Sequence, residues 1–153
     1  MMREILFRGK TKKGEWVYGF LIKGQRTYIA TCNAIEYMVV SLMGMASLEL
    51  VEVIPETVGQ YTGLKDKNGT RIFEGDCFLG ADEEDLVFVV KFRHGHFCLV
   101  TYGVRGALME YGWDETAGGF GECDCAPMSD YNMDTFEVNG NIHDNKNLLE
   151  EQL

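Results

Sequence analysis

The sequence predicts an all-β fold, a barrel-like arrangement of antiparallel strands with Gly-rich turns and little helix. Short runs of β-branched and aromatic residues recur along the 153 residues, and such side chains suit a half-buried sheet. The 18 glycines divide these runs, whereas there are only 2 prolines. No long run repeats apolar residues at helical spacing. Strands separated by Gly-rich turns, without amphipathic helices, are typical of barrels.

Three strands are expected at the start of the chain, over residues 4–10, 16–22 and 26–32. Short polar turns that contain a glycine divide them, which is the pattern of successive hairpins. Trp16, Tyr18 and Phe20 alternate along the second strand, so their rings should lie on one face of the sheet. Residues 33–50 have no clear period and are expected to be irregular or a β-arm.

The stretch from residue 50 to residue 79 carries the densest turn signals. A strand over residues 50–54 should end at Pro55, because proline cannot donate to a ladder. Asn68-Gly69 predicts a tight turn with positive φ angles. Further short strands are expected over residues 58–62, 71–73 and 77–79.

The second half of the chain is predicted to be less regular. Residues 86–92 form the most apolar run, which suits a strand covered on both faces. Residues 93–95 should turn this strand into a partner over residues 96–102. The Gly-rich residues 103–132 are expected to be irregular, and a final strand is expected over residues 136–143.

The charge of the chain restricts its partners. Lys and Arg number 14 and Asp and Glu number 24, which gives a formal net charge of −10. This acidity disfavours nucleic acid as a partner, because binding to phosphates depends on basic side chains that displace counterions. The basic cluster of Lys10, Lys12 and Lys13 is expected to be a solvated hairpin turn. No cofactor is predicted.

Cysteine use and hydropathy indicate the compartment. The 5 cysteines are unevenly spaced, and the first residues contain no apolar signal segment. The longest apolar run, over residues 38–45, is too short to span a bilayer. We therefore expect a cytoplasmic protein with reduced thiols and no membrane partner. The length suits one domain over residues 1–153, with a division into β subdomains 1–80 and 81–153 left open.

The candidate metal ligands are weak. His94, His96 and Cys98 alternate, and three such donors on one face would suit a zinc ion. The glycine between the histidines marks a hairpin tip, where alternation fails, so the prediction is that no metal is bound. Cys123 and Cys125 form a Cys-x-Cys pair, with no second pair to complete a zinc cluster.

No arrangement of residues predicts catalysis. No Ser or Cys stands on a strand-turn-helix elbow with a histidine at hand. Glu74 and Asp76 flank a glycine and would suit acid–base chemistry, but acids at such bends more often accept hydrogen bonds from turn amides. The acidic run 82–85 lacks the spacing of a calcium loop. The aromatic residues of 16–20 leave the stacking of single-stranded bases open as an alternative.

Several motifs follow one another along the chain. The first is residues 3–10 followed by Trp16-Val17-Tyr18-Gly19. The second runs over residues 55–69 and continues through Ile72-Phe73-Glu74-Gly75-Asp76. The closing segment is residues 136–145. Together these motifs resemble the YopX family, small proteins of bacteriophages and prophages, and the closing segment is similar to the family's Glu-Val-x-Gly-Asn-Ile motif.

The resemblance implies a mostly β fold, a phage or prophage origin in a bacterial host and self-association, and it implies no enzymatic activity. The recurrent residues of the motifs are expected to be structural, at bends and in the core. They are Trp16, Tyr18, Gly19, Pro55, Gly59, Gln60, Tyr61, Gly63, Asn68, Gly69, Glu74, Gly75, Asp76, Gly140 and Asn141.

The predicted function is that of a non-enzymatic accessory protein, an oligomer that binds a phage or host protein. An acidic surface suits a protein partner, and no residue is predicted to be catalytic or to bind a cofactor. Two alternatives stay open: a single-stranded nucleic-acid-binding barrel, and a metal-binding protein that uses His94, His96 and Cys98.

Overall fold

Antiparallel strands make up nearly all the regular structure, as the sequence predicts, and the all-β class is confirmed. The computed structural model describes residues 3–31, 49–79, 87–102, 111–114, 119–122 and 126–146. At residues 101–102, 111–114, 119–122 and 126 it describes the backbone alone. The chain separates into two compact units, residues 1–61 and residues 62–153.

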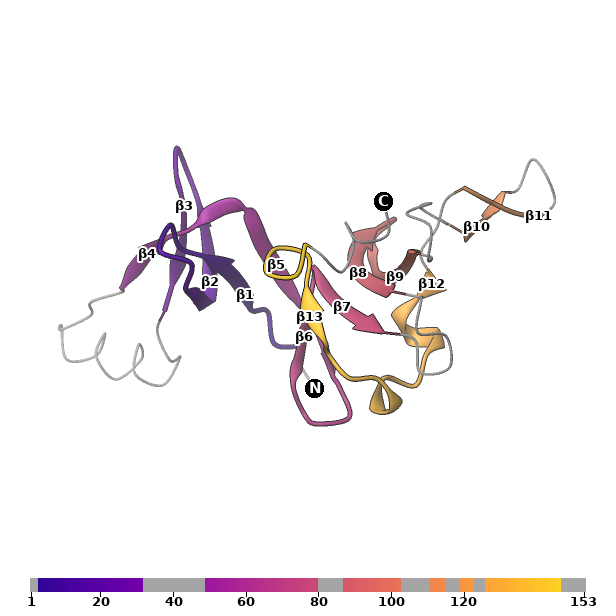
Figure 1. The fold of residues 1–153 in the computed structure, drawn as a ribbon. Helices are drawn as coiled ribbons and strands as arrows, with labels where there is room; N and C mark the ends of the chain where they lie inside the picture. The colour runs from indigo at the N-terminus through magenta and orange to yellow at the C-terminus, as the bar shows by residue number, and fades with distance from the viewer. Residues whose placement is uncertain are drawn as a thin grey trace. The chain divides into compact units, whose positions relative to one another are not determined.

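The first unit is one curled sheet. Its strands are β1 (Phe7–Lys10), β2 (Trp16–Lys23), β3 (Thr27–Ala30), β4 (Leu50–Glu52) and most of β5 (Ile54–Lys65), in the order β4-β3-β2-β1-β5. Only one residue separates β4 from β5, yet they pair with β3 and β1 respectively. The sheet must therefore curl, as the run of β4 into β5 in Figure 1 shows. No sheet closes within the described residues, so the predicted barrel is not confirmed.

Close contacts at two glycines pack this sheet tightly. A Cβ atom on Gly9 would lie 2.9 Å from the side chain of Val53, and one on Gly19 would collide with the carbonyl oxygen of Ala30. Ile29 and Val53 are buried there, with 0% and 3% of their surface exposed. Glycine is required at position 19 because backbone, which cannot move aside, occupies the space of a side chain.

Pro55 does not end a strand, and this expectation is wrong. It lies near the start of β5, which continues for ten residues beyond it. The pairing register of β5 with β1 shifts between Ile54 and Gly59, which leaves the proline in an irregularity where no ladder donor is needed. The Thr57 hydroxyl supplies hydrogen bonds at this irregularity. It accepts from the Lys10 N–H at 2.8 Å and donates to the Ile54 carbonyl at 2.7 Å.

The second unit contains a five-stranded sheet in the order β12-β9-β8-β7-β13. Its strands are β7 (Asp76–Leu79), β8 (Val87–Arg93), β9 (His96–Tyr102), β12 (Ala126–Pro127) and β13 (Gly140–Asn141). The end of β5 and β6 (Arg71–Phe73) also belong to this unit, as does a hairpin of β10 (Tyr111–Asp114) and β11 (Gly119–Glu122). Two 3-10 turns, η1 (Met128–Asp130) and η2 (Met133–Thr135), precede β13.

The predicted strands of this unit are found in part. Strands β6, β7, β8 and β9 lie where they were expected. Strand β8 is covered on both faces only at its start, since Val89 and Val90 are fully buried and Phe92 is exposed. The final strand is much shorter than residues 136–143, because it pairs with β7 only at Gly140 and Asn141. The region 103–132, expected to be irregular, contains β10, β11, β12 and η1.

Phe136 ties the η1–η2 segment to the sheet. Its ring makes edge-to-face contacts with Phe78, Phe88 and Tyr131, with centroids 5.5, 6.3 and 5.8 Å apart. Such pairs contribute about 0.5–1.5 kcal/mol each beyond their area. The core that these rings adjoin contains Ile72, Phe78, Val90, Phe97, Leu99, Met128 and Met133.

The two compact units meet within β5, after residue 61. The boundary that the sequence suggested between two subdomains lies later, after residue 80. The number of domains stays a prediction.

Gly19→Ala should destabilise the protein by about 1–3 kcal/mol, the usual cost of an overpacked core position. The reason is the overlap of the new methyl group with the Ala30 carbonyl. The measurement is the free energy of unfolding by chemical denaturation. Gly24→Ala is the matched control, because the nearest atom to its Cβ is 3.9 Å away, and its change should stay within about 0.5 kcal/mol. Equal effects of the two substitutions would contradict the packing described.

Candidate functional site

The residues singled out in the sequence gather at two places in the structure. The turns at 66–69 and 74–76 lie in the second unit with residues 136–141. The aromatic residues of β2 lie in the first unit. Each place is described within its own unit.

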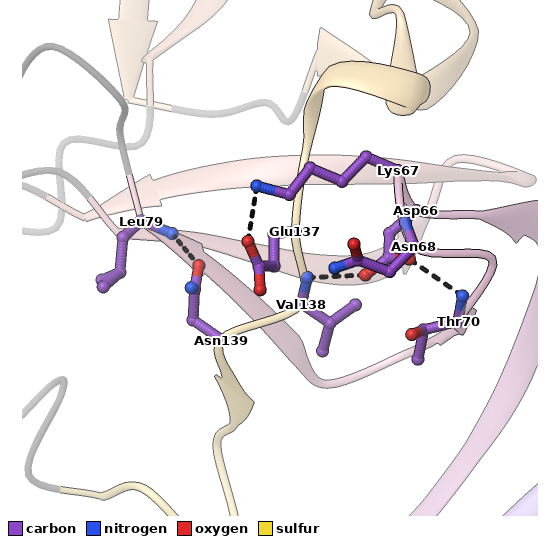
Figure 2. Close-up of polar contacts among 8 residues, drawn as sticks. All are labelled: Asp66, Lys67, Asn68, Thr70, Leu79, Glu137, Val138 and Asn139. Atoms are coloured by element: carbon purple, nitrogen blue, oxygen red, sulfur yellow. Dashed lines mark hydrogen bonds and ion pairs between the residues drawn. The ribbon is translucent and has the colours of Figure 1, made fainter.

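Asp66 organises the first of these turns. Its carboxylate is 4% exposed, and its Oδ1 accepts the backbone N–H of Asn68 at 2.9 Å and of Thr70 at 2.8 Å. Its Oδ2 accepts the N–H of Val138 at 3.0 Å. Figure 2 shows the carboxylate between the loop of residues 66–70 and the segment of Val138. One buried side chain thus joins two segments separated by 72 positions in the sequence.

Further contacts hold the same segment, residues 136–139, against the loop and against β7. The Lys67 N–H donates to the Phe136 carbonyl at 2.9 Å, and the Lys67 ammonium pairs with Glu137. The Asn139 Oδ1 accepts the Leu79 N–H at 2.8 Å (Figure 2). The ion pair is half-exposed, so it contributes little beside the buried hydrogen bonds.

The hydrogen bonds of Asp66 lower its pKa. Burial alone would raise it, because a buried carboxylate loses solvation. The N–H groups of Val138, Thr70 and Asn68 and the Thr70 hydroxyl stabilise the charged form and hold the pKa below the ordinary value of 3.8. Asp66 is therefore ionised in the folded protein near neutral pH.

The Asn68-Gly69 turn forms where it was predicted, but only Gly69 has a positive φ angle, of 79°. The Gly69 N–H donates to the Asp66 carbonyl at 2.9 Å. A hairpin with positive φ at both turn residues occurs instead at His94-Gly95, with φ angles of 51° and 83°. Histidine is an unusual first residue for such a turn, which favours Asn, Asp or Gly.

The second turn joins the middle of the chain to its closing motif. Strand β13 pairs with β7, with Asn141 opposite Asp76 and Gly140 opposite Cys77. The Ile142 N–H donates to the Gly75 carbonyl at 2.9 Å. Asp76 is 1% exposed, and its Oδ2 accepts the Phe73 N–H at 2.8 Å. This carboxylate closes a turn, while Glu74 lies at its partly exposed bend.

Asn141 shapes the turn that follows. Its Oδ1 accepts the N–H groups of His143 and Asp144, both at 3.0 Å, and its Nδ2 donates to Asp144 Oδ2 at 2.9 Å. A Cβ atom at Gly140 would collide with the side chain of Asn145. The identities of Gly140 and Asn141 thus follow from backbone geometry and hydrogen bonding.

The remaining signature residues lie within strands of the sheet. Gly59 is opposite Arg8 and Gln60 is opposite Phe7. Tyr61 is 4% exposed, and Gly63 has a φ angle of 90°, which favours glycine. Their roles as observed are in packing, pairing and bending the chain.

The three candidate metal ligands are not equivalent. His94 lies in the exposed turn and His96 begins β9. Cys98 is fully buried and disulfide-bonded, so the expectation that all thiols are reduced fails there. Cys77 is a free thiol. Among the described residues, no three His, Cys, Asp or Glu side chains lie close enough to hold a metal ion.

Other candidates lie outside the described residues, namely Cys123, Cys125 and the acidic run 82–85. Within the part of the chain that the structure describes, no helix is long and apolar enough to cross a membrane.

An exposed apolar surface covers one face of the sheet in the first unit. Residues opposite one another in an antiparallel pair share a face, so the register places these side chains together. We call this surface the β2 face, and it consists of Trp16, Tyr18, Phe20, Ile22, Tyr28 and Leu50. Tyr18, Phe20 and Leu50 are each about half exposed, at 49%, 46% and 50%. The prediction that the rings share one face is confirmed.

Cations border the β2 face. The Arg8 guanidinium lies 4.7 Å from the centroid of the Trp16 ring, and the Lys10 ammonium lies 5.8 Å from it. At the other end of β2, Arg26 pairs with Glu52 at 3.3 Å. A shallow hollow of about 340 Å³ opens beside this pair, lined by Ile22, Gly24, Gln25, Arg26 and Tyr28.

The sequence did not predict the role of Asp66, nor that Tyr28 and Leu50 belong to the β2 face. Asp66 had a signal, since an Asp shortly before Asn-Gly favours a turn in which its side chain accepts backbone amides. Leu50 and Tyr28 had none, because their place on the same face as Phe20 and Ile22 depends on the register of three strands.

Comparisons with known proteins agree with this fold. A family model described as YopX protein matches residues 6–150. A search of curated proteins finds no match to the sequence. Among solved structures, the crystal structure of protein EF1440 from Enterococcus faecalis is similar, with a TM-score of 0.50 and 18% identity over 97% of this chain and 99% of that chain. At this identity the likeness concerns the fold alone.

Asp66→Asn should lower the free energy of unfolding by about 2–4 kcal/mol, because the amide turns a donor toward buried N–H groups and removes charge-assisted bonds. Chemical denaturation measures the loss. Asp134→Asn, at an exposed position in η2, should change stability by less than about 0.5 kcal/mol. A loss no larger than that of the control would refute the central role of Asp66.

The stability that Asp66 contributes should also depend on pH. Its pKa is lower in the folded protein than the ordinary 3.8, so the contribution is complete above about pH 5 and is lost as the pH falls through the folded pKa. The difference in unfolding free energy between the wild type and Asp66→Asn should therefore shrink in acid. Denaturation of both proteins across this range measures it, and a difference that grows in acid would be inconsistent with a lowered pKa.

Proposed function

The chain belongs to the YopX protein family, and from this membership and the β2 face we propose that it acts without catalysis, by binding protein. The protein is proposed to be a phage or prophage accessory factor that works as an oligomer in the cytoplasm of a bacterial host. The single observation that supports this function best is the exposure of the β2 face.

The β2 face has the character of a protein-binding surface. Tyr18, Phe20 and Leu50 together leave on the order of 300 Å² of apolar side chain exposed, given about 150–250 Å² for one aromatic side chain. Contiguous apolar patches of this size on a domain surface commonly mark interaction sites. Tyrosine and tryptophan beside arginine are also the residues enriched among interface hot spots.

The polar turns support binding rather than chemistry. The buried carboxylates of Asp66 and Asp76 accept backbone N–H groups, which engages oxygens that acid–base chemistry would need. Within the described residues, neither carboxylate lines the hollow beside the β2 face. The family brings no assigned activity to add to these residues.

The proposed compartment rests on the family resemblance. Disulfides are rare in the reducing bacterial cytoplasm, so the bonded state of Cys98 gives the cytoplasmic location no support. The phage origin and the oligomeric state rest on the same resemblance.

Photo-crosslinking inside cells tests the proposed function. The chain carries benzoylphenylalanine at position 18 in the β2 face, or at position 5 as the control, where Ile5 is an exposed apolar residue of the first unit outside the β2 face. We expect position 18 to yield discrete protein adducts and position 5 to yield few. Phe20→Ser should reduce the adducts at position 18 by about tenfold, as expected for a hot-spot residue. Adducts with nucleic acid alone, or none at all, would refute protein binding through this face.

A further inference from the structure

Charge is divided unequally between the two units. Residues 1–61 contain seven of the 14 basic residues but only six of the 24 acidic residues, a formal charge of +1. Residues 62–153 contain the other seven basic and 18 acidic residues, a formal charge of −11. The acidity of the chain therefore belongs to the second unit.

The hairpins that carry the β2 face are basic. Residues 8–26 contain six basic residues and a single acidic one, Glu15, which gives a local charge of +5. Glu52 of β4 adds one nearby negative charge, and it is paired with Lys12 at 3.9 Å and with Arg26 at 3.3 Å. The β2 face thus lies on hairpins with an excess of basic residues, in a unit of formal charge +1.

We propose that the β2 face binds the acidic unit, residues 62–153, of a second copy of the chain. This inference rests on the proposed function and names its partner. The apolar side chains supply contact area, and the charge difference of the two units supplies attraction and orientation. Oligomers then form head to tail, with the first unit of one copy on the second unit of the next.

Charge argues against a symmetric face-to-face pair. Two β2 faces in contact would bring together two hairpin pairs of charge +5, and two second units would bring together charges of −11. Like charges placed opposite each other cost several kcal/mol at an interface. Only the contact between unlike units has favourable electrostatics on both sides. Such heterologous contacts produce closed rings or open filaments.

A single-stranded nucleic acid fits the β2 face less well. Ile22 and Leu50 offer no ring for a base to stack on, and Trp16 already has Arg8 and Lys10 against its ring. An acidic protein surface with apolar residues of its own needs no rings for stacking, so this objection does not apply to it.

Isotope mixing combined with photo-crosslinking tests the partner. Purified protein with benzoylphenylalanine at position 18 is mixed with an equal amount of the 15N-labelled wild-type chain and irradiated at micromolar concentration. We expect adducts between labelled and unlabelled copies, with the labelled peptide drawn from residues 62–153. Adducts to residues 1–61 of the other copy, adducts within one copy, or no adduct would each overturn the inference.

The same test separates this inference from the proposed function. If purified protein gives no adduct between copies while position 18 in cells captures a different protein, protein binding through the β2 face stands and the self-association fails. If position 18 captures nucleic acid alone or nothing in either setting, both fail.

Charge reversal gives an independent check. Lys13 and Lys23 are exposed at the two ends of β2, and the double variant Lys13→Glu with Lys23→Glu should weaken self-association by roughly three- to tenfold. Lys146→Glu is the matched control, since it makes the second unit more acidic and should leave the association unchanged or stronger. Sedimentation velocity over a concentration series measures both. Equal weakening by the two changes, or no weakening by the double variant, would contradict the proposed charge pairing.

Discussion

The second unit depends on one buried carboxylate. Asp66 accepts three backbone N–H groups, and through Val138 it fixes the segment that begins with Phe136 and ends in β13. That segment brings the Phe136 ring onto Phe78 and Phe88 and pairs Asn141 with Asp76. Without the hydrogen bonds of Asp66, the desolvation of a buried charge would oppose all of these contacts. The loop of residues 66–70 therefore determines where the closing motif lies.

This constraint explains why the most distinctive stretch of the sequence offers so little chemistry. Its glycines and its Asn-Gly dipeptide supply the bends, and its carboxylates are committed to backbone amides. The surface that suits binding lies elsewhere, on β2, where the sequence shows only an alternation of large rings. Residues that specify the fold and residues that suit a partner are separate sets in this chain.

Strand positions could be predicted where local pattern decides them. Strands β2, β6, β8 and β9 follow from β-prone runs between turn residues, and the face shared by Trp16, Tyr18 and Phe20 follows from alternation. The prediction at Pro55 was wrong because the residue lies at a register shift. There, pairing does not require the N–H group that proline lacks. Residues 136–139 look like a strand, but their hydrogen-bond partners include the carboxylate of Asp66 and the N–H of Lys67, which no local pattern reveals. For the same reason, the position of Leu50 on the same face as Phe20 needed the structure.

The β2 face and the charges of the two units lead to the proposal that this YopX protein assembles through unlike units. Light scattering of the purified chain across ionic strength tests this assembly. We expect a mass above that of one chain at about 0.05 M NaCl, falling toward one chain near about 0.5 M, where the Debye length is only a few ångströms. A mass of one chain at both salt concentrations, or an oligomer that high salt strengthens, would contradict it.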